Sequence, residues 1–166
     1  MLHTNRNYGY ACINMGFSTL PKSKRLTTNC GMIKRTFTER GLPYASELAL
    51  LNLKDLNKIL VWNLENNIHF YRISSDIIPW ASEYDITDLP HFEEIAYEAE
   101  KAGNFARQHN MRLTSHPGPF NKLASPKERV FELTRKDLTV HGDLFDLIGL
   151  ERSPYAKLNI HVGAAY

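Results

Sequence analysis

The sequence predicts an α/β fold of the (β/α) TIM-barrel type, because strand-length apolar segments alternate with amphipathic segments of helix length. The order β-α-β-α-β-α-β implies right-handed crossovers and a parallel sheet. A doubly wound sheet fits the same order, but no GxGxxG or Walker loop follows the first strand. Four strands cannot close an eight-stranded barrel of about 250 residues. We therefore expect residues 1–166 to be one partial domain, half of such a barrel.

Composition places the chain among ordinary globular proteins. It has 166 residues, of which 43% are hydrophobic and 23% charged, enough for one domain with a proper core. No apolar run approaches the roughly 18 residues of a membrane span, and no signal peptide opens the sequence, so we expect an intracellular protein, cytoplasmic or nuclear, without a membrane partner. Cys12 and Cys30 form no CxxC pair, which favours reduced thiols.

The first predicted strand covers residues 7–14, and a long irregular stretch of residues 15–43 follows it. This stretch carries a net charge of +5, whereas the rest of the chain carries −3. Such a basic loop fits a surface that contacts nucleic-acid phosphates, and a solvated mobile loop is the alternative. The basic residues are Lys22, Lys24, Arg25, Lys34, Arg35 and Arg40.

The middle of the chain predicts two helices around a second strand. Ser46 is an expected N-cap for a helix ending near residue 66, with leucines at helical spacing on one face. Residues 68–74 form the second strand, and an acidic loop of residues 75–89 follows. Asp88 is the expected cap of a helix over residues 90–109, whose inner stripe is Ile95, Ala99, Ala102 and Ala106.

The third strand belongs to residues 111–120, where alternating apolar residues lead to His116 and a Pro-Gly turn. A capping box at residues 125–128 predicts the next helix, which ends at Gly149 as a left-handed C-cap. Residues 157–162 form the fourth strand and carry His161 near its end, two residues before Gly163. Histidines at the ends of two parallel strands predict a metal site at the rim of the sheet, and ordinary hydrogen-bonded core histidines are the alternative.

Four motifs, in order and at fitting distances, extend this prediction. They are GYACIN at residues 9–14, FYRISSD with the following PWAS at residues 70–82, SHPGPF at residues 115–120 and IHVGAAY at residues 160–166. Together they resemble the UV damage endonuclease (UvdE) family of barrel enzymes, of whose barrel this chain would supply the N-terminal part. The resemblance implies a DNA repair endonuclease that nicks damaged double-stranded DNA on the 5′ side of a lesion with a divalent metal cluster, commonly manganese.

The resemblance also assigns roles to residues. It implies that His116 and His161 are metal ligands, and Glu83 stands where the family has a further histidine ligand. A carboxylate suits manganese, although a solvated loop acid is the alternative for Glu83. No catalytic residue is assigned apart from these ligands.

Four residues match family positions at the lesion. Tyr10 and Asn14 correspond to residues that read displaced bases. Pro119 and Phe120 stand where the family has glutamine and an aromatic residue as a wedge into the base stack; Phe120 keeps the apolar wedge, and Pro119 loses the amide. For Tyr10, a half-buried strand tyrosine is the alternative.

Two other functions remain open at this point. The chain could be a non-catalytic nucleic-acid-binding or scaffolding half-barrel, or a sugar isomerase-type metal barrel. For the endonuclease we expect that residues 1–166 alone are inactive, because the later strands with their acidic and histidine ligands, and so the C-terminal half of the barrel, are missing.

Overall fold

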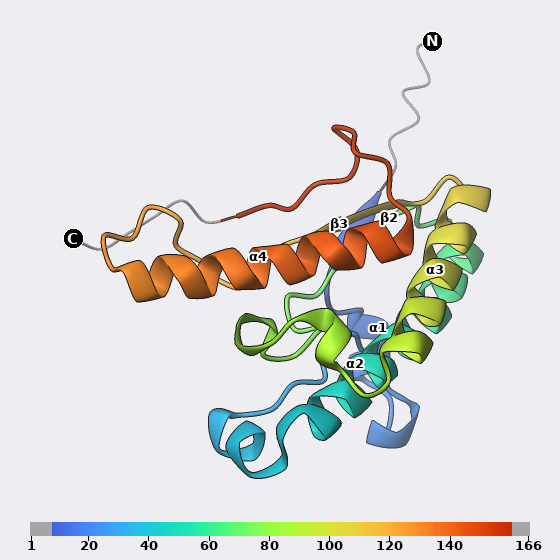
Figure 1. The fold of residues 1–166 in the computed structure, drawn as a ribbon. Helices are drawn as coiled ribbons and strands as arrows, with labels where there is room; N and C mark the ends of the chain where they lie inside the picture. Colours follow the sequence, from blue (N-terminus) through green and yellow to red (C-terminus); the bar gives the residue numbers. More distant parts are fainter. Residues whose placement is uncertain (1–7, 161–166) are drawn as a thin grey trace.

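The computed structural model describes residues 8–160 and contains the predicted parallel sheet (Figure 1). Its strands are β1 (Gly9–Ala11), β2 (Phe70–Ile73) and β3 (Arg112–Ser115), in the order β1-β2-β3. Both pairings are parallel, and Tyr10, Tyr71 and Leu113 lie side by side in the register. The α/β alternation expected from the sequence is therefore confirmed for this part of the chain.

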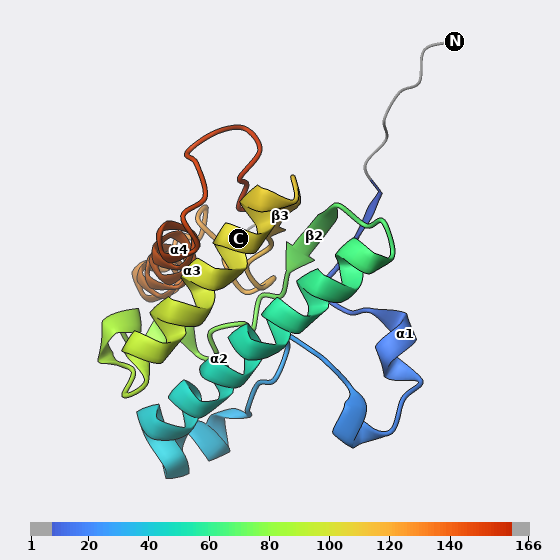
Figure 2. The same cartoon turned by 90° about the vertical axis from the view of Figure 1, so that its right-hand side faces the viewer.

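Helices cover the face of the sheet that carries Tyr71, Ile73 and Leu113, all of them buried. The long helices are α2 (Lys34–Glu65), α3 (Phe92–Gln108) and α4 (Glu128–Ile148), and α3 packs between the other two (Figure 2). Short elements are α1 (Met15–Ser18) and the 3-10 turns η1 (Lys22–Lys24), η2 (Ala81–Glu83) and η3 (Ile86–Asp88). The predicted inner stripe of α3 is buried, as is the leucine face of α2 at Leu53, Leu56 and Leu60.

The region 15–43 differs from the long irregular loop predicted for it. It contains α1, η1 and the start of α2, which begins at Lys34 rather than at Ser46. Gly41 (φ 59°, ψ −155°) breaks the helical geometry just before Pro43, so two helical segments join at a kink, which a left-handed glycine permits. Ser46 caps nothing at this helix start; its hydroxyl is buried and accepts a hydrogen bond from the backbone N–H of His91 at 2.8 Å.

Two other predicted caps also differ. Helix α3 begins at Phe92, and Asp88 closes η3, where it exchanges capping hydrogen bonds with Asp85. Helix α4 has Lys127, not the predicted Ser125, at its N-cap position, and the Lys127 side chain makes no capping bond. The Ser125 hydroxyl instead accepts from the Lys127 N–H at 3.2 Å, which closes a local turn before the helix. The C-terminal prediction is confirmed, since Gly149 ends α4 in the left-handed conformation at φ 71°.

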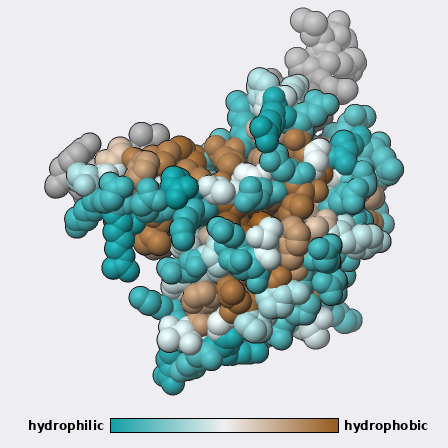
Figure 3. All heavy atoms as spheres, in the orientation of Figure 1, coloured by the Kyte–Doolittle hydropathy of each residue, from teal (hydrophilic) through white to brown (hydrophobic). Residues whose placement is uncertain are grey.

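The predicted fourth strand is present only as a bridge within residues 8–160. Leu158 pairs in parallel with Ser115, with hydrogen bonds Ser115 N–H to Lys157 O at 3.0 Å and Asn159 N–H to Ser115 O at 2.9 Å. The rest of that segment, including His161, lies outside the described residues. Hydrophobic residues gather beside α4 along the segment that leads to this end of the chain (Figure 3). No helix within residues 8–160 is long and apolar enough to cross a membrane.

The contact between α3 and α4 gives a test of the packing. A Cβ on Gly103 of α3 would lie 1.6 Å from the carbonyl oxygen of Ile148, so Gly103→Ala must separate the helices. We expect it to lower the free energy of unfolding by about 2–3 kcal/mol in urea titrations. Gly142→Ala on α4 is the matched control, because its Cβ would meet nothing within 4 Å; alanine there should add about 0.5–1 kcal/mol. If Gly103→Ala and Gly142→Ala changed the free energy of unfolding equally, the close contact of Gly103 with Ile148 would be contradicted.

Candidate functional site

The carboxyl edge of the sheet forms the candidate site. Because β2 and β3 are parallel, the loops after them leave from the same edge, and with α4 they enclose a cavity of about 730 Å³. Both loops and the helix contribute polar and aromatic side chains to its wall. These include Asp76, Trp80, Glu83, Phe120, Asn121, Thr134 and Asp137. This is the arrangement in which α/β proteins place ligand sites.

The loop after β2 is held in an unusual backbone conformation. Trp80 lies in the left-handed region (φ 61°, ψ 33°), which costs a non-glycine residue about 1–3 kcal/mol. Its indole N–H donates to the carbonyl of Met32 at 2.9 Å, and its ring stacks on Phe37 with centroids 5.4 Å apart. The Glu83 N–H then donates to the Trp80 carbonyl at 3.0 Å, which closes η2 against α4. These contacts offset the strain and place exposed Glu83 at the cavity.

The predicted metal ligands are only partly brought together. Glu83 lines the cavity, whereas half-buried His116 follows β3 directly and is not among the lining residues. Within residues 8–160, no three His, Cys, Asp or Glu side chains lie close enough to hold a metal ion. The described residues therefore do not complete a metal site, and the placement of His161 lies outside them.

A cluster of buried His141 with the acidic residues Asp137 and Asp76, which line the cavity, was not predicted. His141 on α4 is buried, with its Nε2 3.8 Å from Asp137 Oδ2 and its Nδ1 3.5 Å from the Ser115 hydroxyl. Burial lowers the pKa of His141, while the charges of Asp137 and Asp76 oppose that shift. Partial burial and the charge of Asp137 raise the pKa of Asp76. The spacing of Asp137 and His141, one helical turn apart, was the available sequence signal.

The lowered pKa of His141 predicts a pH dependence of stability. The unfolded chain takes up a proton near pH 6.5 that folded His141 resists, so the free energy of unfolding should fall as pH drops below about 6.5, by at most about 1.4 kcal/mol per pH unit. His141→Gln removes this proton uptake. Urea titrations at pH 7.5 and 5.5 should therefore show a smaller difference for the variant. An identical difference would contradict the assignment.

Tyr10 lies on the helix-covered side of β1, and Asn14 is the N-cap of α1. The Tyr10 hydroxyl donates to Asn63 Oδ1 on α2 at 2.7 Å and accepts from Asn14 Nδ2 at 3.2 Å. Asn14 Oδ1 also caps α1 by accepting from the Gly16 N–H at 2.9 Å. These polar atoms are engaged within the fold, and contact of either residue with a lesion stays a prediction.

The six predicted basic residues are exposed but do not form one loop. Lys22, Lys24 and Arg25 belong to η1 and its end, next to α1, whereas the other three lie in the first turns of α2 (Figure 2). In this second group Arg35 pairs with Glu39 at 2.8 Å, and Arg40 pairs with Glu47 at 3.6 Å. The structure thus divides the predicted basic surface into two.

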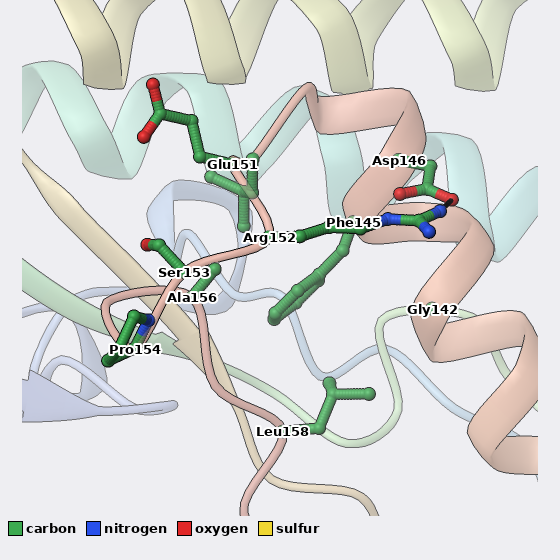
Figure 4. A pocket seen from close by; sticks show the side chains of 10 residues that line it. Gly142, Phe145, Asp146, Glu151, Arg152, Ser153, Pro154, Ala156 and Leu158 are labelled. Atoms are coloured by element: carbon green, nitrogen blue, oxygen red, sulfur yellow. Dashed lines mark hydrogen bonds and ion pairs between the residues drawn. The ribbon is translucent and has the colours of Figure 1, made fainter.

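A second cavity, of about 430 Å³, lies at the other end of α4 (Figure 4). Phe145 and Leu158 contribute its apolar wall, and Arg152 pairs with Asp146 at 3.0 Å beside it. None of the predicted site residues within 8–160 lines this cavity, so the carboxyl edge remains the candidate site.

Together, the parallel sheet and the polar loops at its carboxyl edge define an α/β protein of the class that binds ligands at strand ends. The family model described as UV-endonuclease UvdE matches residues 6–166. The chain therefore belongs to the UvdE family.

Individual relatives agree. The UV-damage endonuclease of Schizosaccharomyces pombe is 34% identical over 95% of this chain and 26% of its own length. The UV DNA damage endonuclease of Clostridium perfringens is 30% identical over 93% of this chain and 36% of its own. A solved structure titled "Crystal Structure of SacUVDE" matches with a TM-score of 0.74 and 28% identity, over 94% of this chain and 49% of that one. The chain thus spans between about a quarter and a half of these proteins.

Proposed function

We propose that residues 1–166 form the N-terminal part of a barrel endonuclease that nicks double-stranded DNA 5′ to UV photoproducts and other lesions. The observation that carries this proposal is the UvdE family match, which runs from residue 6 to residue 166. Glu83, His116 and Phe120 support it, because they all lie on the two loops that leave the carboxyl edge of the sheet. The family match gives no support to a sugar isomerase.

For the cofactor we propose a divalent metal cluster, with manganese as the first candidate. His116, His161 and Glu83 would contribute imidazole nitrogens and a carboxylate, donors that suit such an ion. Bound metals would neutralise phosphate oxygens and lower the pKa of a coordinated water toward 7. Further ligands would come from the C-terminal half of the barrel, because the described residues do not complete a site.

For DNA recognition we propose that Phe120 enters the base stack. Phe120 is 88% exposed on the loop after β3, more than any other large hydrophobic residue within 8–160, so its ring is available to contact DNA. Pro119 beside it would stiffen the turn. Tyr10 of β1 and Asn14, the N-cap of α1, would contact the lesion, and the basic residues would track phosphates without reading sequence.

A second candidate is a nucleic-acid-binding half-barrel without catalysis. It is favoured by one observation, that exposed basic side chains lie on η1, at its end and on the first turns of α2, where they can bind phosphates without any catalysis. Both candidates predict binding to DNA, and only the endonuclease predicts a cut.

The division of the basic residues allows a matched test of DNA contact. The start of α2 is joined to the cavity loop by the Phe37–Trp80 stack, so we expect Lys34, Arg35 and Arg40 to contact phosphates more than the η1 group. If all three do, neutralising them should reduce the log–log salt slope of binding by about 2.7. Neutralising Lys22, Lys24 and Arg25 is the control of equal charge. If the salt slope is unchanged in both triple variants, neither group of basic residues contacts DNA phosphates.

Mapping of the cut tests the proposed function directly. A duplex oligonucleotide with a single thymine dimer, labelled at one end, is incubated with the full-length protein and Mn²⁺. We expect one incision on the 5′ side of the dimer and none in the undamaged duplex. Binding without incision would favour the non-catalytic candidate.

A further inference from the structure

The turn that carries Phe120 combines the most exposed large apolar side chain of residues 8–160 with a buried neighbour. Phe120 is 88% exposed, whereas Asn121 is 7% exposed. This difference in exposure means that the Asn121 side chain anchors the turn to the rest of the protein, whereas the Phe120 ring projects into solvent.

Helix α4 holds the turn at two successive residues. The Asn121 side-chain amide donates to Asp137 Oδ2 at 2.6 Å, and the Lys122 backbone N–H donates to the Thr134 hydroxyl at 3.0 Å. Thr134 is buried, and its hydroxyl donates in turn to the Val130 carbonyl at 2.8 Å. The bond to Asp137 is charge-assisted, which makes it the stronger of the two.

The same face of α4 also contacts the start of the loop. Thr134, Asp137 and His141 lie on one side of the helix, at the spacing of one and two turns. His141 approaches Asp137 with one ring nitrogen and the Ser115 hydroxyl, at the end of β3, with the other. One helix face thus contacts both the exit from β3 at Ser115 and the turn at Asn121 and Lys122.

We propose that Asn121 and Asp137 are positioning residues for Phe120, which hold the turn so that the ring is already aimed at the base stack of double-stranded DNA. This inference rests on the proposed function and deepens it. A preformed wedge avoids the cost of ordering a loop during binding. The carboxylate of Asp137 contacts no DNA in this account; it acts through Asn121.

Reversing the hydrogen bond tests the proposal without changing the shape of either side chain. Asn121→Asp leaves two carboxylates facing each other and should release the turn. The double variant Asn121→Asp with Asp137→Asn restores one donor and one acceptor with their positions exchanged. Phe120→Ala is the reference for complete loss of the wedge. All variants are made in the full-length protein, and their thermal unfolding is compared.

Two readouts separate positioning from stability. One is the fluorescence of 2-aminopurine placed beside a thymine dimer, which rises when the base is unstacked; the other is the incision rate on the same duplex. We expect Asn121→Asp to lose most of the fluorescence rise and about 10- to 100-fold in incision, as for a group misplaced by about 1 Å. The double variant should recover both.

The outcomes distinguish this inference from the function on which it rests. If Phe120→Ala keeps the fluorescence rise and the incision rate, Phe120 does not enter the base stack, and both the proposed wedge and the positioning role are refuted. If Phe120→Ala loses both but folded Asn121→Asp keeps them, only the positioning role is overturned. Failure of a folded double variant to recover also overturns it.

Discussion

His116→Ala should abolish most incision of damaged DNA by the full-length protein while leaving its fold intact. His116 is the first residue after β3, and the turn that follows covers residues 119–120, so this substitution changes no residue of the strand. Mutation of a residue that only hydrogen-bonds to a metal ligand commonly costs about 10- to 100-fold in metal affinity or activity. Loss of a ligand itself should therefore cost at least about 100-fold in incision. Bound manganese and the incision rate are measured together.

A matched control for this variant is His69→Ala. His69 is also half-buried but precedes β2, at the opposite edge of the sheet, where its Nδ1 lies 3.3 Å from the His109 carbonyl. We expect this control to retain metal and incision. Full metal occupancy in a His116→Ala, His161→Ala double variant would contradict the ligand assignment.

Residues 1–166 expressed alone should not nick damaged DNA above background. The sheet described here has open edges, which barrel closure would remove, and Ile160 next to the bridge at Leu158 is 36% exposed. We expect weak metal binding and self-association, together with a loss of incision of at least about 1,000-fold, because several ligands would be missing at once.

Supplying the second half of a barrel is the control for that loss. Co-expression with the C-terminal half-barrel of a UvdE-family protein should recover soluble protein and incision, whereas a second copy of residues 1–166 should recover at most solubility. A monomeric, soluble 1–166 chain that nicks irradiated plasmid with added manganese would refute the half-barrel account.

The sequence predicted the parts of the fold that depend on repeated burial. The period-2 pattern placed β2 and β3 correctly, and helical spacing identified the buried stripe of α3 at Ile95, Ala99 and Ala102. These patterns are reliable because every position that faces the core needs an apolar side chain, and such positions recur at the period of the strand or helix. The family resemblance was confirmed as well, since its motifs are spread over the whole chain.

Features that depend on tertiary contacts could not be predicted from the sequence. The start of α2 was missed because Gly41 allows a kink that looks like a loop boundary, and Phe37 docks that segment on Trp80. The expected cap at Ser46 failed because its hydroxyl accepts from His91, which is 45 residues away. The roles of Asp137 and His141 could not be predicted either, because they depend on contacts with Asn121 and Ser115, which come from another part of the chain.

The most direct test of a metal-dependent endonuclease is nicking of supercoiled plasmid by the full-length protein with Mn²⁺. We expect nicked circles from UV-irradiated plasmid, none from untreated plasmid, and none after chelation of the metal or in His116→Ala. No nicking of irradiated plasmid by folded, metal-loaded protein, or equal nicking of both plasmids, would contradict the assignment of a metal-dependent endonuclease for damaged DNA.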